Sequence, residues 1–111
     1  MSHQVRFYTT KSGKKVVEEF ILRQDGPTIA KINRHIELLI SRGPYLGLPY
    51  SRNLKQGLYE LRIRGKNEVR IFYISMSSNG TIILLHAFNK RSQKIPVKEL
   101  EIAKKRQKEL T

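Results

Sequence analysis

The fold is decided by residues 58–89, which read LYELRIRGKNEVRIFYISMSSNGTIILLHAFN. Three runs within it, Leu58 to Arg64, Val69 to Met76 and Thr81 to Asn89, are rich in β-branched and aromatic residues and have the length of strands. The segments GKN and SNG stand between them and carry hairpin turn chemistry. The stretch therefore predicts a three-stranded antiparallel meander.

Helical patterns and short strand-like segments flank this meander. Residues 5–10 read as a first strand, and a short edge strand is expected near Arg52 and Leu54. Apolar residues recur at helical spacing from about 14 to 23 and from Pro27 to Gly43, and Pro96 opens a last helix. We expect a single domain over residues 1–111 of the α+β class. It would have an antiparallel, mixed-edge sheet of about four strands, two N-terminal helices and one C-terminal helix, with the helices on one face of the sheet.

The composition points to a polyanionic partner. Lys and Arg number 22 against 9 Asp and Glu among 111 residues, which gives a formal net charge of +13. Such an excess attracts phosphate polymers, and we expect RNA. Cysteine is absent, which excludes disulfides and thiolate chemistry. Because no stretch has the length of a membrane span or a signal peptide, we expect a cytoplasmic protein without membrane contact.

Alternation along the first strand of the meander separates an apolar face from a charged one. The charged positions are Glu60, Arg62 and Arg64. In the next strand Arg70 is a lone cation within an apolar run, which is costly unless the charge has a partner. Two readings stay open for that partner. It is either a carboxylate, from Glu60 or Glu68, or the phosphate of a ligand bound on an open concave surface.

Clustered cations follow the last strand of the meander. Phe88 precedes Lys90, Arg91 and Lys94, so its ring could be a stacking platform for a base beside groups that bind its phosphate. The alternative is that Phe88 belongs to the core. Neighbouring cations repel one another without an anion, so this cluster favours a phosphate ligand.

The sequence offers no metal or cofactor motif. The three histidines lack ligand spacing and are expected to be structural or exposed, and the acidic residues do not cluster as Mg²⁺ ligands would. RNA cleavage without a metal would proceed by attack of the ribose 2′-hydroxyl on the adjacent phosphate, with cations stabilising the charge that develops. Lys90, Glu60, Tyr73 and His86 are all conceivable proton-transfer groups, and spacing does not choose among them.

Three segments carry a family resemblance: LYELRI from Leu58, VRIFY from Val69, and LLHAFNKR from Leu84 with Lys94-Ile95-Pro96 after it. Together they resemble the HigB branch of the RelE/ParE toxin superfamily, within a phage-derived protein family of HigB-type toxins. The resemblance implies the toxin of a type II toxin-antitoxin system. Such toxins enter the ribosomal A site, cut mRNA there without a metal, and are held inactive by a cognate helix-turn-helix antitoxin, here a HigA-like one.

The resemblance also implies the site residues. The expected catalytic set is Arg62, Arg64, Arg70, Lys90 and Arg91, with Phe88 at the mouth of the cleft. Beyond the resemblance, we also expect Lys94, Lys66 and Tyr73 to bind RNA together with Phe88. Glu60 stands where RelE has a lysine, so the proton acceptor stays open. Two other functions are alternatives: a ParE-like inhibitor of DNA gyrase, and an RNA-binding module without catalysis.

Overall fold

The computed structural model describes residues 2–76 and 78–111. Within them the chain forms three helices and five strands: β1 (Val5–Phe7), α1 (Val16–Leu22), α2 (Gly26–Arg42), β2 (Ser51–Asn53), β3 (Tyr59–Ile63), β4 (Val69–Ser75), β5 (Ile82–Asn89) and α3 (Val97–Leu110). This is an α+β fold, as predicted, and every expected element is present.

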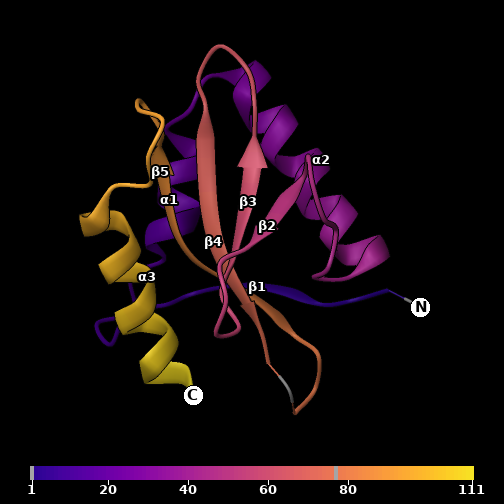
Figure 1. The fold of residues 1–111 in the computed structure, drawn as a ribbon, viewed down its shortest axis with the longest axis vertical. Coiled ribbons are helices and arrows are strands. Elements are labelled where there is room, and N and C mark those ends of the chain that lie inside the picture. Colours follow the sequence, from indigo (N-terminus) through magenta and orange to yellow (C-terminus); the bar gives the residue numbers. More distant parts are fainter. Residues whose placement is uncertain (1, 77) are drawn as a thin grey trace.

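The sheet has the strand order β1-β5-β4-β3-β2 (Figure 1). The predicted meander is confirmed, because β3 pairs antiparallel with β4 and β4 with β5. β2 adds an antiparallel edge, whereas β1 pairs in parallel with β5. The sheet is therefore mixed at one edge and has five strands, where about four were expected. Both edge strands are only three residues long, which weakens their signal in the sequence.

The helices cover both faces of the sheet, so the expectation that they share one face is wrong. One core lies under α1 and α2 and includes Val17, Leu39, Ile71 and Tyr73. The other lies between the sheet and α3 and includes Phe72 and Ala103 among its members. The physical reason is that β4 is apolar on both sides, and a strand with two apolar faces must be covered on both.

The entry to α2 is fixed by a side-chain cap. Asp25 precedes the helix, and its Oδ1 accepts a hydrogen bond of 2.8 Å from the Thr28 N–H, while Pro27 occupies the first turn. At the other end Gly43 has a φ of 90°. A Cβ there would lie 2.9 Å from the His3 ring, so glycine is required both by conformation and by space.

A β-bulge interrupts the pairing of β4 with β5. Tyr73 pairs with Leu84 and Phe72 with His86, so Leu85 is the extra residue on β5. Leu84 belongs to the core under α1 and α2, whereas Leu85 belongs to the core under α3. The bulge therefore turns the following part of β5 so that Phe88 pairs with Arg70 and faces the α3 side.

No helix formed by the described residues is long and apolar enough to cross a lipid bilayer.

The core under α1 and α2 provides a test of the fold. Leu39→Ala removes a side chain that is fully buried under α2, and we expect it to lower the free energy of unfolding by about 2–5 kcal/mol. Leu22→Ala, at a position that is 70% exposed, is the matched control and should change it by less than about 0.5 kcal/mol. Urea unfolding followed by circular dichroism measures both, and equal losses would contradict the core described here.

Candidate active site

Three neighbouring strands bring cations to one end of the face that α3 partly covers. Arg62 on β3 and Arg70 on β4 are cross-strand partners. Lys90 follows β5, and its N–H donates to the carbonyl of Glu68 at 2.9 Å. The register of the sheet thus sets these three residues side by side.

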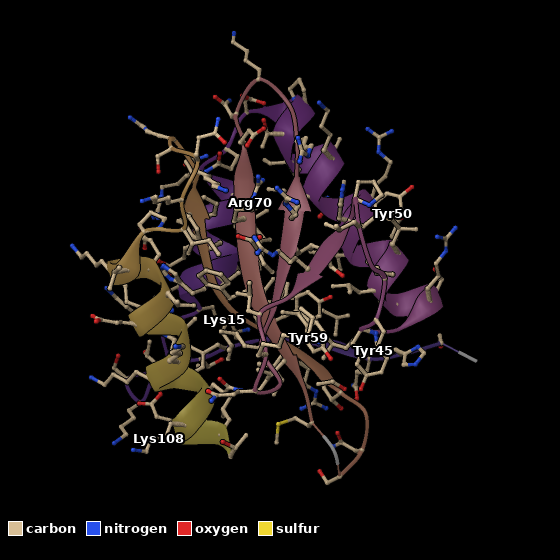
Figure 2. All side chains as sticks on the ribbon, in the orientation of Figure 1. Lys15, Tyr45, Tyr50, Tyr59, Arg70 and Lys108 are labelled. Carbon is tan, nitrogen blue, oxygen red and sulfur yellow. The ribbon has the colours of Figure 1, made fainter. Side chains whose placement is uncertain are left out.

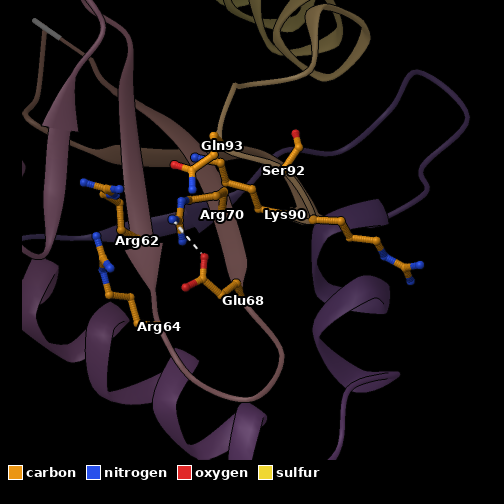
Figure 3. Close-up of a pocket in the computed structure, with 8 residues that line it drawn as sticks. Arg62, Arg64, Glu68, Arg70, Lys90, Ser92 and Gln93 are labelled. Carbon is orange, nitrogen blue, oxygen red and sulfur yellow. Dashed lines mark hydrogen bonds and ion pairs between the residues drawn. The ribbon is translucent and has the colours of Figure 1, made fainter.

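These cations line a hollow of about 460 Å³, which we call the cationic hollow (Figure 3). Its lining residues are Arg62, Arg64, Glu68, Arg70, Lys90, Arg91, Ser92 and Gln93. The structure therefore brings all five residues of the expected catalytic set into one place, from β3, the residue directly after β3, β4 and the loop after β5. Their part in catalysis stays a prediction.

The centre of the site is a buried ion pair. Arg70 is 2% exposed and Glu60 is 1% exposed. Their Nε and Oε2 atoms are 3.8 Å apart, and Glu60 Oε1 lies 3.9 Å from Arg62 Nε. Burial holds the pKa of Arg70 below its ordinary value, and the carboxylates of Glu60 and Glu68 partly offset that shift. Of the two partners left open for Arg70, the structure shows the carboxylate.

The ion pairs around Glu60 leave hydrogen-bonding capacity unused. Among the described residues, Glu60 Oε2, Arg62 Nε and Arg70 Nε are buried and have no hydrogen-bond partner. Buried polar atoms are normally paired, and exceptions often mark functional sites. The arrangement supplies two cations, Arg62 and Arg70, that line the cationic hollow, and one buried carboxylate, Glu60, that holds them without lining it.

Glu68 is a second carboxylate at this hollow. Its Oε2 lies 3.2 Å from Arg70 Nη2 in a charge-assisted hydrogen bond, shown by the dashed line in Figure 3. Its side chain is 37% exposed, so it occupies the solvent side of the guanidinium. A phosphate that approaches Arg70 from the hollow must compete with Glu68.

Sequence reasoning named Glu68 only as a partner for Arg70 and missed Ser92 and Gln93. These two residues belong to the loop between β5 and α3 and carry no charge. Their place beside the cationic cluster of Lys90 and Arg91 was the only signal that could have identified them.

Two residues of the expected RNA-binding set are core residues, which corrects that assignment. Phe88 is 5% exposed and packs its ring against Phe72, with centroids 5.4 Å apart. It faces the same side as Arg70, but the core under α3 encloses it. The core reading of Phe88 is therefore the right one.

Tyr73 lies on the opposite side of the sheet from Arg70. Its hydroxyl donates to the carbonyl of Pro44 at 2.6 Å, and burial raises its pKa to about 12. Its ring stacks on Tyr59, which Figure 2 shows well away from Arg70. Tyr73 therefore neither reaches the cationic hollow nor exchanges protons there.

The other two expected RNA-binding residues are exposed but lie outside the cationic hollow. Lys66, in the β3–β4 turn, lines a neighbouring hollow together with Lys90 and Arg91. Lys94 lies in the loop before α3 and does not line either hollow.

His86 holds α3 against the sheet. Its Nε2 lies 2.6 Å from Glu99 Oε1, and Arg106, which donates to the Leu85 carbonyl at 2.8 Å, lies 3.4 Å from its Nδ1. Burial lowers the pKa of His86 and outweighs the opposite effect of Glu99. His86 does not line the cationic hollow, so its role is structural, as expected for the histidines.

Within the described part of the chain, no three His, Cys, Asp or Glu side chains gather closely enough to hold a metal ion.

The fold defined by this sheet and these helices is that of the RelE toxins. The chain superposes on an arginine-to-alanine double mutant of Escherichia coli toxin RelE in the free state with a TM-score of 0.67 at 9% identity, covering 96% of this chain and 98% of that one. It matches a chain of the toxin-antitoxin complex RelBE2 from Mycobacterium tuberculosis with a TM-score of 0.54 at 19% identity, covering 81% and 100%. At these identities the likeness shows the fold alone.

The family follows from the sequence of the same chain. Residues 19–108 match the family described as phage derived protein Gp49-like (DUF891), and the chain belongs to this family. No curated protein matches it. The expected resemblance to a phage-derived, RelE-like toxin family is therefore confirmed.

The buried ion pair leads to a stability prediction. Glu60→Gln leaves Arg70 buried without its Glu60 partner, so we expect the free energy of unfolding to fall by about 3–5 kcal/mol. Glu68→Gln changes a partly exposed carboxylate and should cost less than about 1 kcal/mol. Urea unfolding of the two variants and wild type makes the comparison. If Glu68→Gln proved the more damaging, Glu60 would not be the main partner of Arg70.

The position of His86 leads to a prediction about acid sensitivity. Because its pKa is lowered in the folded state, its contribution to stability is full above the ordinary value of 6.5 and is lost as pH falls through the folded pKa. His86→Gln should remove the decrease in the free energy of unfolding that protonation of His86 causes at low pH. Urea unfolding above and below pH 6.5 measures it, and a variant as acid-sensitive as wild type would contradict the assignment.

Proposed function

We propose that this chain is the toxin of a type II toxin-antitoxin system and acts as a metal-independent, ribosome-dependent mRNA endoribonuclease. The observation that carries the proposal is the cationic hollow, where Arg62, Arg70 and Lys90 converge, with Arg62 and Arg70 held by the buried carboxylate of Glu60. The RelE-like fold and the family support it.

The arrangement suits the transesterification of RNA. The ribose 2′-oxygen bonds to the adjacent phosphorus while the bond from phosphorus to the 5′-oxygen breaks, which leaves a cyclic 2′,3′-phosphate and a 5′-hydroxyl. Negative charge grows on the phosphoryl oxygens during this step. The guanidinium groups of Arg62 and Arg70 are held in advance by Glu60, so they can stabilise that charge once the phosphate displaces Glu68 from Arg70.

One group must accept the 2′-proton and another must protonate the 5′-oxygen. Of the four groups conceivable from the sequence, Tyr73 and His86 are engaged elsewhere. Glu60 is buried and does not line the hollow. Lys90 therefore remains, and Glu68 joins it because it lines the hollow. We assign proton acceptance to the carboxylate of Glu68 and proton donation to the ammonium group of Lys90.

The proposed partners follow from charge. A net charge of +13 favours binding to ribosomal RNA, which would concentrate the protein near the A site and its mRNA. One solved relative of similar fold is part of a toxin-antitoxin complex. We propose a cognate helix-turn-helix antitoxin of the HigA-like type, with an acidic or amphipathic segment that covers the cationic hollow.

Substitutions in the hollow test the proposal. Arg62→Ala and Lys90→Ala each remove one cation at the phosphate, and each should slow mRNA cleavage about 100-fold or more. Arg70→Ala is a poorer choice because it leaves Glu60 buried without its Arg70 partner. Arg52→Ala, at an exposed position on β2, is the control with the same charge change. The measurement is 5′-end mapping of mRNA after each chain is induced alone in a bacterial host.

Cuts confined to translated frames, present in wild type and Arg52→Ala but absent in the two hollow variants, would support the proposal. Intact mRNA with growth arrest would contradict it and favour a ParE-like gyrase inhibitor. Intact mRNA without arrest would contradict it and favour a non-catalytic RNA-binding module.

A further inference from the structure

A second hollow of about 540 Å³ adjoins the cationic hollow. The two share Glu68, Lys90 and Arg91, so these residues form a ridge between them. The second hollow extends from this ridge across the β3–β4 turn to the junction of α1 and α2. A chain bound in the cationic hollow can therefore continue directly over Lys90 and Arg91.

The second hollow is also cationic. Beyond the shared ridge it adds Arg23, from the end of α1, and Lys66, from the β3–β4 turn. Four of its lining side chains are cations and two are carboxylates, Asp25 and Glu68. Arg23 and Lys66 are both exposed, and they approach the hollow from different elements. Such a pair can hold a phosphate between them.

Carboxamide side chains distinguish this hollow from a simple patch of charge. Gln24, Asn67 and Asn89 all line it. Asn67 Nδ2 donates to Asp25 Oδ2 at 2.6 Å, and Asn89 Nδ2 donates to Gln24 Oε1 at 3.4 Å. Gln24 Nε2 in turn donates to the Phe20 carbonyl at 3.3 Å. Because a carboxamide has two donor hydrogens and two acceptor lone pairs, Asn67 keeps most of its capacity for a ligand, and Gln24 keeps one donor and one acceptor.

Asp25 fixes the orientation of Asn67. Its carboxylate is charged because hydrogen bonds, chiefly from Thr28, hold its pKa below the ordinary value. It therefore acts as an acceptor and draws the Asn67 N–H groups towards itself, which leaves the Asn67 carbonyl oxygen to face away. The hollow thus combines cations with amides of fixed direction.

We propose that the second hollow binds the nucleotide next to the scissile phosphate, with Arg23 and Lys66 on its phosphate and Asn67 and Gln24 on the edge of its base. Amides that present a donor beside an acceptor are suited to the hydrogen-bonding edges of bases, and an unstacked base in single-stranded RNA exposes those edges. The hollow has the volume of an ordinary small-ligand site. This inference rests on the proposed function, because it takes the cationic hollow as the place of cleavage.

Binding of short RNA tests the second hollow without cleavage. The probes are a dinucleotide and a trinucleotide with 2′-O-methyl groups, which block the attacking oxygen. Extension by one nucleotide should raise the affinity of wild type about tenfold at fixed salt. In the double variant Arg23→Ala and Lys66→Ala that gain should disappear, whereas dinucleotide binding should stay within about twofold of wild type.

Matched controls separate the hollow from total charge. Arg52→Ala combined with Lys104→Ala removes the same charge from exposed positions on β2 and α3 and should keep the gain. Asn67→Ala should reduce the preference among the four bases at the added position. Asn79→Ala, in the β4–β5 turn, also removes a carboxamide that makes one internal hydrogen bond, at 3.0 Å to the Thr81 N–H, and should keep that preference.

The outcomes are distinguishable from those of the proposed function. An affinity gain that survives in the double variant, or a base preference that Asn67→Ala leaves intact, would overturn the second hollow even if mRNA is cut on ribosomes. If wild type cuts no mRNA but its affinity gain depends on Arg23 and Lys66, the nucleotide site would be supported and the proposed nuclease activity would be contradicted.

Discussion

The site depends on the carboxylate of Glu60, which lies between two guanidinium groups. Arg62 and Arg70 are direct cross-strand partners, and like charges in that position repel one another. Glu60 offsets this repulsion from beneath, at 3.9 Å from one and 3.8 Å from the other. Because its own exposure is only 1%, neither water nor salt substitutes readily for it. Two cations are thereby kept close together and without a full set of hydrogen bonds.

The position of α3 determines which part of the sheet face that holds Arg62 and Arg70 stays accessible. α3 packs against the half of that face that holds Phe72, Leu85 and Phe88, and it stops short of the end where Arg62 and Lys90 lie. The same side of one sheet thus supplies a closed core at one end and an open site at the other. The arginine at the boundary, Arg70, belongs to both, since it is buried like a core residue and lines the hollow.

Much of this arrangement could be predicted from local pattern. Alternation in LYELRIR placed Glu60, Arg62 and Arg64 on one face, and the lone charge in VRIFY identified Arg70. The same alternation puts Tyr73 on the side opposite Arg70, so its assignment to RNA binding went against the pattern. Phe88 could not be settled in this way, because only the position of α3 decides whether its face is covered.

The remaining features arise from contacts between segments that are distant in the sequence. The second hollow joins the α1–α2 junction, the β3–β4 turn and the end of β5, and no local pattern relates these three. The apolar run in β4 indicates that helices cover both faces of the sheet, because a strand with only one buried face would alternate between apolar and polar residues. The two edge strands are short, and the parallel pairing of β1 with β5 depends on a crossover through most of the chain.

The bulge at Leu85 has a consequence for how relatives of this chain should be aligned. Pairing counted from the β4–β5 turn would place Leu85 opposite Phe72, and every later side chain of β5 would then point to the wrong side. The extra residue shifts the pairing register by one, so the side chain of Lys90 lies on the same side of the sheet as Arg70. A relative with a one-residue gap at this position can keep the same site, whereas a gap after His86 would move the lysine to the other face. The effect of a deletion in this strand therefore depends on its position: at the bulge it keeps the side on which Lys90 lies, although it removes the buried side chain of Leu85.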